Sequence, residues 1–229
     1  MFSTLLLPEN WKRLVCDGYC VLNNVDAEAL LPIARELGHP HFDPRDRVLV
    51  KDIRPQPVAV ANANTLSSRY GMGAFPLHTE AAYLPRPPRF LLLYCVRPGS
   101  GGRTTILLDA AKVFSRISCR RRLGTWVVKA GRRPFLCHAL WGSPPKDFGI
   151  RYDRECLFPR GPAAQAEDQL ISDFISRSTP TKIVWTEKKL LVVDNLRMLH
   201  GRGEANDDDR DRWLKRVLVA EEALNGLGF

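Results

Sequence analysis

The sequence has no apolar segment long enough to cross a membrane. No run of apolar residues approaches the roughly 18 that a spanning helix needs. Residues 1–7 contain no basic segment, and the polar residues of Pro8-Glu9-Asn10 follow at once, so a secretion signal is not expected. These absences exclude an integral membrane protein, and we expect a cytoplasmic location.

The cysteines show no spacing typical of a metal-thiolate site or a disulfide framework. The six cysteines are scattered along the chain, and no C-x-x-C motif occurs. They stand at positions 16, 20, 95, 119, 137 and 156. In a chain of this size we expect them to be reduced, as cytosolic cysteines are.

The sequence also lacks an aromatic-interleaved basic motif of the kind that binds nucleic acid. Its formal net charge is +9, but the basic residues are spread out apart from Arg120–Arg122 and Arg132–Arg133. An acidic run, Asp207–Asp209, lies near the C-terminus. The charge therefore indicates a solvated basic surface, or one that docks an anionic substrate or carrier protein. Nucleic-acid binding is suggested by the charge alone and is not expected.

What is present is an ordinary globular composition. The chain has 229 residues, 45% of them hydrophobic and 26% charged, with no internal repeat and no low-complexity linker. We therefore expect a single domain over residues 1–229 with a substantial core.

Hydrophobic patterning predicts many short strands and few helices. Helices are expected at 26–37, 109–117 and 163–176. Strands are expected at 48–50, 58–61, 90–96, 104–108, 126–128, 182–185, 190–193 and 213–219, with 182–193 forming a hairpin. Because strands and helices do not alternate, the pattern favours a sandwich or jelly roll over a parallel α/β sheet.

Two short motifs far apart in the chain carry the chemistry. His78 and Glu80 are two residues apart, so on a strand both side chains point to the same side. His200, from a distant strand, would complete a face of two imidazoles and one carboxylate, which suits a non-haem Fe(II) with open positions. Taken singly, His78 and Glu80 could be a polar pair at a strand end, and His200 a turn histidine. A further cluster, His39 to Asp43, lies in a Pro-rich segment and is interpreted as a loop.

Arg212 follows the second histidine and can hold a dicarboxylate, because a guanidinium grips a carboxylate with two hydrogen bonds. Arg216 lies four residues on, on the same side of a strand. Together with the histidines and Glu80, these arginines indicate an iron- and 2-oxoglutarate-dependent oxygenase.

The ordered set of motifs resembles the clavaminate synthase-like, taurine dioxygenase-type (TauD/TfdA) family. The resemblance runs from about Phe75 to Val219 and rests on four segments. These are Phe75–Glu80, Gly101–Thr104, Asn195–Arg202 and Asp211–Arg216.

This resemblance implies a fold, a cofactor and a reaction. The fold would be a mostly β double-stranded β-helix, a distorted jelly roll with flanking helices, binding one Fe(II). His78, Glu80 and His200 would be the catalytic metal ligands. Thr104 and Arg212 would bind 2-oxoglutarate, and Arg216 would assist it or reach the substrate. With O2, the family converts 2-oxoglutarate to succinate and CO2 while it hydroxylates an unactivated C–H bond. The sequence does not distinguish hydroxylation from desaturation or ring formation.

The substrate is less well defined. Glu80 separates the chain from the family's halogenases, and the His-Thr-Glu motif resembles the subgroup acting on free or carrier-bound amino acids. The segment from His200 to Arg212 and the whole chain are shorter than in that subgroup, so lids over the substrate are expected to differ. We expect a small, amino-acid-like substrate and a role in specialised metabolism. The alternative is a non-catalytic jelly-roll binding module, against which the intact triad and Arg212 argue.

Candidate substrate residues come from two segments. The residues before the first metal motif could line the pocket, and the segment 150–153 resembles one that carries substrate-binding acids in some amino-acid hydroxylases of the family. The candidates are Ser67, Ser68, Arg69, Tyr70, Arg151 and Asp153. Each could equally belong to an ordinary loop or surface pair. Tyr83 and Trp141 are interpreted as core or lid aromatics.

Overall fold

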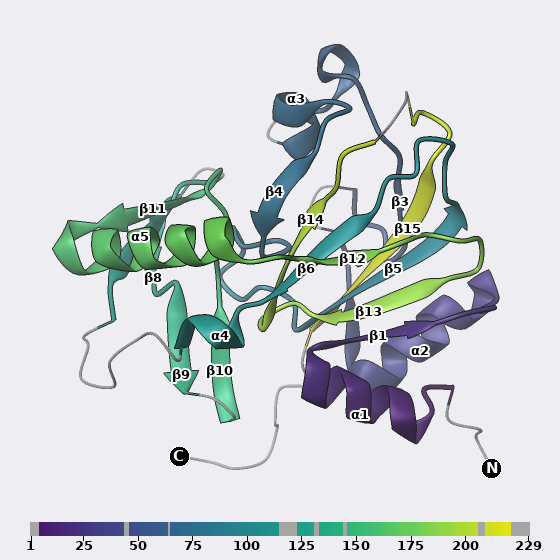
Figure 1. Cartoon of the computed structure of the whole chain (residues 1–229), viewed down its shortest axis with the longest axis horizontal. Coiled ribbons are helices and arrows are strands. Elements are labelled where there is room, and N and C mark those ends of the chain that lie inside the picture. Colours follow the sequence, from purple (N-terminus) through teal and green to yellow (C-terminus); the bar gives the residue numbers. More distant parts are fainter. Residues whose placement is uncertain are drawn as a thin grey trace.

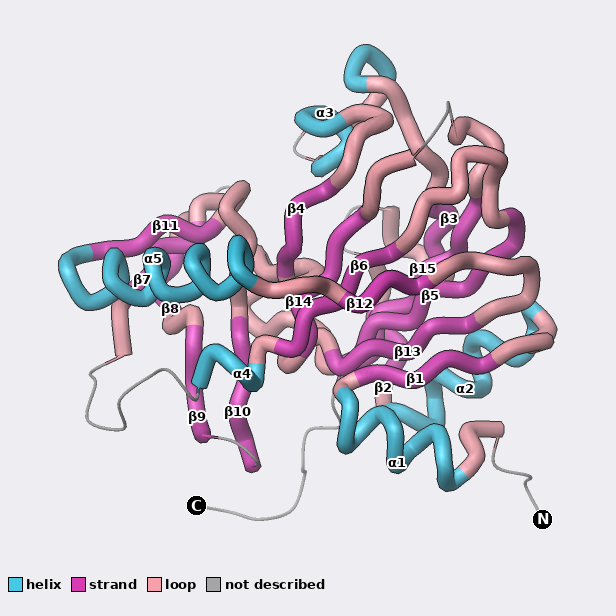
Figure 2. The backbone as a smooth tube through the Cα atoms, viewed as in Figure 1, coloured by secondary structure: helices cyan, strands magenta, loops and turns pink. Residues whose placement is uncertain are grey.

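The protein consists mostly of antiparallel β-strands with helices on the outside (Figure 1). The computed structural model describes residues 5–43, 46–63, 65–114, 123–130, 133–143, 146–205 and 209–220. Within these residues the strands form four sheets of six, four, three and two strands (Figure 2). The expectation of a mostly β protein with flanking helices is confirmed.

The largest sheet has the strand order β1-β13-β5-β15-β2, and β3 also pairs with β15. Its strands are β1 (Tyr19–Leu22), β13 (Leu190–Asp194), β5 (Phe90–Arg97), β15 (Trp213–Ala220), β2 (His39–His41) and β3 (Lys51–Ile53). The central strands β13 and β5 are buried over nearly their whole length. Both faces of this sheet are therefore covered, which explains why these strands read as continuous apolar runs.

The second sheet has the order β12-β6-β14-β4. Its strands are β12 (Thr181–Ile183), β6 (Thr105–Asp109), β14 (Met198–Arg202) and β4 (Phe75–His78). One face packs toward the large sheet in a core that includes Leu107, Met198 and Leu218. The other face packs outward through Leu77, Leu108 and Leu199. Because side chains alternate along a strand, successive residues of these strands point into different cores.

Helices and two small sheets close the outer faces. Helices α1 (Pro8–Asp17) and α2 (Leu30–Leu37) cover the large sheet, whereas α5 (Gly161–Arg177) lies on the opposite side of the molecule (Figure 1). The small sheets are β11-β7-β8 and β10-β9. Their strands are β7 (Thr125–Val128), β8 (Phe135–Cys137), β9 (Leu140–Ser143), β10 (Lys146–Ile150) and β11 (Leu157–Arg160). The remaining short helices are η1 (Ala27–Ala29), η2 (Val58–Val60), α3 (Leu66–Tyr70) and α4 (Ala111–Phe114).

Most of the predicted elements are confirmed, with shifted ends. The strands expected at 90–96, 104–108, 126–128, 190–193 and 213–219 are present, as is the helix at 163–176. The helix expected at 26–37 is a 3₁₀ turn followed by α2. The helix expected at 109–117 is present as α4, and residues 115–117 lie outside the described part. Helix α1 was not predicted.

Two strand predictions and one prediction of strand pairing are wrong. Residues 48–50 precede a strand, β3, that begins at Lys51, and residues 58–60 form a 3₁₀ turn in which Val58 and Val60 are exposed. The hairpin at 182–193 does not form, because β12 pairs with β6 while β13 pairs with β1 and β5. The chain crosses from one sheet to the other here, since the apolar residues 190–193 of β13 need a partner strand on each edge and cover on both faces.

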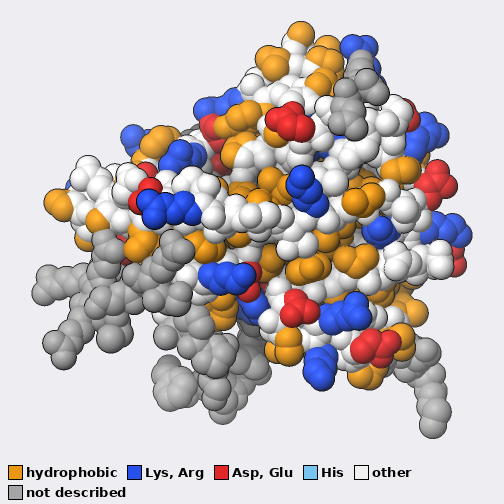
Figure 3. All heavy atoms as spheres, in the orientation of Figure 1, with side chains coloured by type: hydrophobic (Ala, Val, Ile, Leu, Met, Phe, Trp, Pro, Cys, Tyr) orange, Lys and Arg blue, Asp and Glu red, His pale blue; other side chains and the backbone are white. Residues whose placement is uncertain are grey.

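Charged side chains are mixed on the face shown, and the described cysteines are unpaired. On the face shown in Figure 3, Lys and Arg side chains are dispersed among acidic and apolar ones. Arg120–Arg122 and Arg132 lie outside the described residues. Cys16, Cys20, Cys95, Cys137 and Cys156 are all free, as expected. None of the described helices is long and apolar enough to cross a bilayer.

A buried carboxylate, Glu167 of α5, joins this helix to β7. Its two oxygens accept hydrogen bonds from the Gly124 backbone N–H at 2.7 Å and from Trp126 Nε1 at 2.9 Å. We predict that Glu167→Ala lowers the free energy of unfolding by about 1–3 kcal/mol, because two buried donors lose their acceptor. Urea unfolding measures this, with Glu187→Ala on the exposed turn as the matched control. Equal stability of the two variants would contradict it.

Candidate metal site

The register between β14 and β4 brings the two motif histidines together. His200 lies directly opposite His78, and their ring centroids are 4.4 Å apart. Because Leu77 and Leu199 point to the outer core, the alternation turns both histidines toward the space between the two larger sheets. His200 therefore stands on a strand, not in a turn.

Gly201 permits this close pairing. A Cβ at this position would lie 2.7 Å from the Phe75 carbonyl oxygen and 3.1 Å from that of Pro76. Only a residue without a side chain allows the two backbones to approach so closely.

Glu80 reaches the histidines by a different route from the one expected. Strand β4 ends at His78, and Glu80 lies in the turn that follows, so strand alternation does not orient it. Instead the buried Asn195 side chain fixes its backbone. Asn195 Oδ1 accepts from Glu80 N at 2.7 Å, and Asn195 Nδ2 donates to Glu80 O at 3.1 Å. The role of Asn195 was not predicted, although this residue belongs to the second motif.

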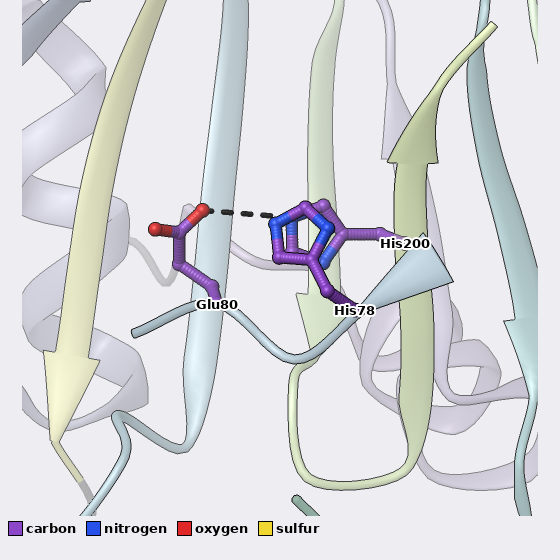
Figure 4. Close-up of side chains that lie close together, drawn as sticks. All are labelled: His78, Glu80 and His200. Carbon is purple, nitrogen blue, oxygen red and sulfur yellow. Dashed lines mark ion pairs between the residues drawn. The ribbon is translucent and has the colours of Figure 1, made fainter. Parts of the chain in front are cut away.

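The three side chains could hold one metal ion between them (Figure 4). Their ligand atoms all lie within 4.8 Å of one another. His78 Nδ1 is 2.9 Å from the Pro76 carbonyl oxygen, which fixes its proton there and leaves Nε2 as the ligand atom. His200 Nε2 is 3.5 Å from Glu80 Oε2. Two imidazoles and one carboxylate are the donor set of a non-haem Fe(II) centre, so these residues fit that ion.

The charges at the site favour the ligating forms. Burial alone would raise the pKa of Glu80, but Arg216 and then His200 and His78 outweigh it, and the pKa falls far below its ordinary value. Burial, assisted by His78, lowers the pKa of His200 to about 4 against the opposing effect of Glu80. At neutral pH the site therefore offers a carboxylate and a neutral His200 imidazole, the forms that bind metal.

Arg216 links Glu80 to a second buried carboxylate. Its Nη1 donates to Glu80 Oε1 at 2.6 Å, and its Nη2 pairs with Asp43, which is also 3.3 Å from Lys51 Nζ. Burial would lower the pKa of Arg216, but Glu80 and Asp43 outweigh it and raise the pKa. The interpretation of residues 39–43 as a loop is wrong, because His39–His41 is strand β2, paired with β15, and this pairing brings Asp43 to Arg216. In the sequence, the role of Asp43 was indicated only by its closeness to His39 and His41 along the chain.

Arg212 is a buried cation with a free hydrogen-bonding group. It precedes β15 on the same face as Leu214 and Arg216, the face that looks toward the space between the sheets. It is 3% exposed, its Nε has no acceptor, and no carboxylate of the described residues lies within ion-pair distance. Burial lowers its pKa to about 10 although Asp209 opposes this. Such a group suits the carboxylate of a bound ligand.

The segment that carries Arg212 is held by Asp209 and Arg103. Asp209 accepts from Arg103 Nε at 3.0 Å and from Gly101 N at 3.1 Å. Thr104, the other residue expected at the 2-oxoglutarate site, accepts at its carbonyl from Gly203 N at 2.9 Å. Within the described residues, no hydrogen bond joins its hydroxyl to Arg212. The role of Thr104 therefore stays a prediction.

The candidate substrate residues fall into two separate groups. Arg69 and Tyr70 of α3 both contact Glu155, Tyr70 through a 2.6 Å hydrogen bond. Asp153 Oδ1 accepts from the Glu155 backbone N–H at 2.9 Å and so belongs to the same turn. Ser68 bonds only locally, to Thr65. Arg151, in contrast, follows β10 and lines a cavity together with Phe135 and Trp141. Their roles toward a substrate stay predictions.

Comparison with known proteins identifies the family. Residues 9–126, just over half of the chain, match the family described as "Taurine catabolism dioxygenase TauD, TfdA family". The chain therefore belongs to the TauD/TfdA family, and the sequence resemblance is confirmed.

Two curated relatives and two solved structures agree with this assignment. Clavaminate synthase 2 of Streptomyces clavuligerus is 27% identical over 197 residues, covering 76% of this chain and 57% of the relative. L-asparagine oxygenase of Streptomyces coelicolor is 25% identical over 226 residues, covering 86% and 62%. The chain thus spans about three fifths of the length of these relatives.

The solved structures share the fold. Asparagine oxygenase in complex with Fe(II), 3-hydroxyasparagine and succinate superimposes with a TM-score of 0.73 at 21% identity, over 93% of this chain and 80% of that one. The non-haem iron oxygenase OrfP in complex with Fe and α-ketoglutaric acid gives 0.70 at 21% identity, over 94% and 81%.

The geometry predicts that Glu80 and His200 are each needed to bind a divalent metal. Glu80→Ala and His200→Ala should each weaken Fe(II) binding at least about ten-fold, since each removes one of three ligands. Anaerobic Fe(II) titration of the purified variants measures this. Glu187→Ala and His41→Ala, at exposed positions, are the matched controls and should bind as the parent does. Parent-like binding by either ligand variant would remove that residue from the site.

The lowered pKa of His200 predicts a pH dependence of stability in the metal-free protein. The unfolded chain protonates this residue near 6.5, whereas the folded chain does so only near 4. Between these values the unfolded state binds more protons, so stability falls as the pH decreases through this interval. Urea unfolding of parent and His200→Asn across the interval measures the effect. The variant should show the shallower dependence, and an equal slope would contradict the burial of a neutral His200.

Proposed function

We propose that the protein is an Fe(II)- and 2-oxoglutarate-dependent oxygenase that hydroxylates, desaturates or cyclises at an unactivated C–H bond of a small, amino-acid-like metabolite. The observation that carries the proposal is the convergence of His78, Glu80 and His200 within 4.8 Å beside the buried, unpaired Arg212. Membership of the TauD/TfdA family supports it.

We also infer that the two larger sheets are the two halves of a distorted jelly roll. They face each other across a shared apolar core that contains Leu107 and Met198 from one sheet and Leu191 and Leu218 from the other. The similarity to the asparagine oxygenase and OrfP structures supports this topology. The site would then lie between the sheets, at the end where β4 stops.

Each residue of the site has a distinct proposed role. His78, Glu80 and His200 would hold the iron, which when bound activates O2 with electrons from 2-oxoglutarate. Arg212 would pair with the far carboxylate of 2-oxoglutarate, and Thr104 would hydrogen-bond to the same group. Arg216 holds Glu80 Oε1 at 2.6 Å and so turns the other oxygen, Oε2, toward His200.

The substrate class is inferred from the relatives. The relatives are named for clavaminate synthesis and for oxygenation of asparagine, and OrfP has been solved with hydroxylated arginine. We propose a free or carrier-bound amino-acid-like substrate for this chain, with a cytoplasmic role in specialised metabolism. Arg69, Tyr70 and Asp153, gathered around Glu155, are candidates for its contacts.

Anaerobic titration with Fe(II) and 2-oxoglutarate tests the proposal. The chelate of iron and a keto acid gives a visible charge-transfer band, which should form in the parent. We predict that Arg212→Ala weakens 2-oxoglutarate binding by about 1.5–3 kcal/mol, the value of a charge-assisted hydrogen bond, while Fe(II) binding is unchanged. Arg35→Ala on the exposed side of α2 is the matched control. Unchanged affinity for 2-oxoglutarate in Arg212→Ala would refute the role of Arg212.

Three measurements separate the proposal from its alternatives. Absence of the band in folded parent protein would favour a non-catalytic binding module that keeps the family fold. Slow conversion of 2-oxoglutarate to succinate in air, lost in His200→Ala, would favour the oxygenase. A nucleic-acid-binding protein would instead show strongly salt-dependent association with DNA or RNA.

A further inference from the structure

A cavity of about 680 Å³ is lined in part by residues 85–89, which follow the metal motif in the chain. It is formed by the segment that follows Glu80, by β8 and β9, and by the ends of β13 and β15. Its lining is mostly apolar and includes Phe135, Trp141 and Leu196. This volume and an apolar lining with a few polar groups are typical of small-molecule sites. None of His78, Glu80, His200, Arg212 and Arg216 lines it.

Among the described residues, the charged side chains that line this cavity are all arginines. They are Arg86, Arg89 and Arg151, and no described Asp or Glu is among the lining residues. Arg89 is already paired with Asp194, at 2.7 Å. Arg86 is exposed, and neither it nor Arg151 has an ion-pair partner in the part of the chain that the structure describes. The cavity therefore carries an uncompensated positive charge, which attracts anions.

Arg151 is the unusual member of this group because it is buried. It is 6% exposed, and only Nη2 has a hydrogen-bond acceptor, the Pro85 carbonyl oxygen at 2.8 Å. Its Nε and Nη1 are buried with no acceptor among the described residues. Its guanidinium carbon lies 5.8 Å from the centre of the Phe135 ring, another lining residue. A buried guanidinium with unused donors is costly unless a ligand supplies the acceptor.

The backbone around Arg151 is joined directly to the metal motif. Thr79, between His78 and Glu80, donates through its hydroxyl to the Ile150 carbonyl oxygen at 3.2 Å and accepts there from Tyr152 N at 3.1 Å. Thr79 N also donates to the Tyr152 carbonyl oxygen at 2.8 Å. Leu196, which lines the cavity, follows Asn195, the residue that holds Glu80. The segments that line the cavity are therefore hydrogen-bonded to the segment that carries the metal motif.

We propose that this cavity binds a carboxylate or phosphate group of the substrate through Arg151, with Arg86 at its open side. That the occupant is the substrate rests on the proposed function, whereas the binding of an oxyanion does not. Arginine suits both groups because its planar N–H donors match two oxygens of one anion. The substrate would thus be an anionic metabolite whose apolar part lies against Phe135 and Trp141.

Cys137 gives a probe inside the cavity. Its partly buried thiol is a lining residue, whereas Cys16 is exposed and elsewhere. Iodoacetamide, a neutral reagent, alkylates the thiolate with loss of iodide, and mass spectrometry of the peptides gives the rate at each cysteine. The experiment uses the metal-free full chain with inorganic phosphate, with propionate, or with sodium chloride at equal ionic strength. It needs neither iron nor 2-oxoglutarate, so its failure is distinct from failure of the proposed function.

An occupied cavity slows the labelling of Cys137. At a concentration about ten times its Kd, a bound anion should slow it roughly ten-fold, with no change at Cys16. Protection by phosphate alone, by propionate alone or by both identifies the group recognised. The proposal would be overturned if Cys137 were labelled at the same rate in phosphate, in propionate and in sodium chloride.

Variants assign the protection to the arginines. Within each variant the rate with anion is compared with the rate in chloride, so a change in the intrinsic reactivity of Cys137 cancels. Arg151→Gln should abolish protection and Arg151→Lys should retain part of it, because lysine keeps the charge but loses the planar fork. Arg86→Gln, at an exposed position, keeps the test available if Arg151→Gln does not fold, and should reduce protection. Full protection in Arg151→Gln, or in Arg86→Gln when that variant alone folds, would overturn the assignment.

Discussion

The site depends on one pairing of strands, the register that places His200 of β14 opposite His78 of β4. These strands are far apart in the chain, and Gly201 lets their backbones approach closely enough to bring the two rings to 4.4 Å. A slip of β4 by one residue against β14 would turn His78 into the outer core and Leu77 toward the site. The apolar cores on the two faces of this sheet therefore fix the position of the metal ligands as firmly as they fix the fold.

Paired charges, in addition to the strand register, hold the site together. Glu80, Arg216 and Asp43 form a buried row of alternating charge that runs from the metal site to the end of β2. Removing one member would leave an uncompensated charge, which is far more costly than the net contribution of the intact set. Arg212 and Arg151 lie outside this row, buried and with N–H groups that have no acceptor among the described residues. In this account, anionic ligands would accept hydrogen bonds from these N–H groups at both positions.

Local patterns predicted much of this arrangement. The apolar runs predicted β5 and β13, and the motifs pointed to the three side chains that the structure brings within 4.8 Å of one another and to the buried Arg212, because these features depend on neighbouring residues. Features set by distant contacts were not predictable in this way. The 182–193 hairpin failed because β13 takes its partners from β1 and β5, and the role of Asp43 was missed because it arises from pairing between β2 and β15. Glu80 was selected for an incomplete reason, since Asn195, and not a strand, orients it.

The most direct test of the central claim is the position of iron itself. Crystals grown anaerobically with Fe(II) and 2-oxoglutarate would locate it by anomalous diffraction at the iron absorption edge. The account predicts one iron bound by His78 Nε2, a Glu80 oxygen and His200, with a carboxylate of 2-oxoglutarate on Arg212. Iron bound elsewhere, or 2-oxoglutarate held away from Arg212, would contradict it.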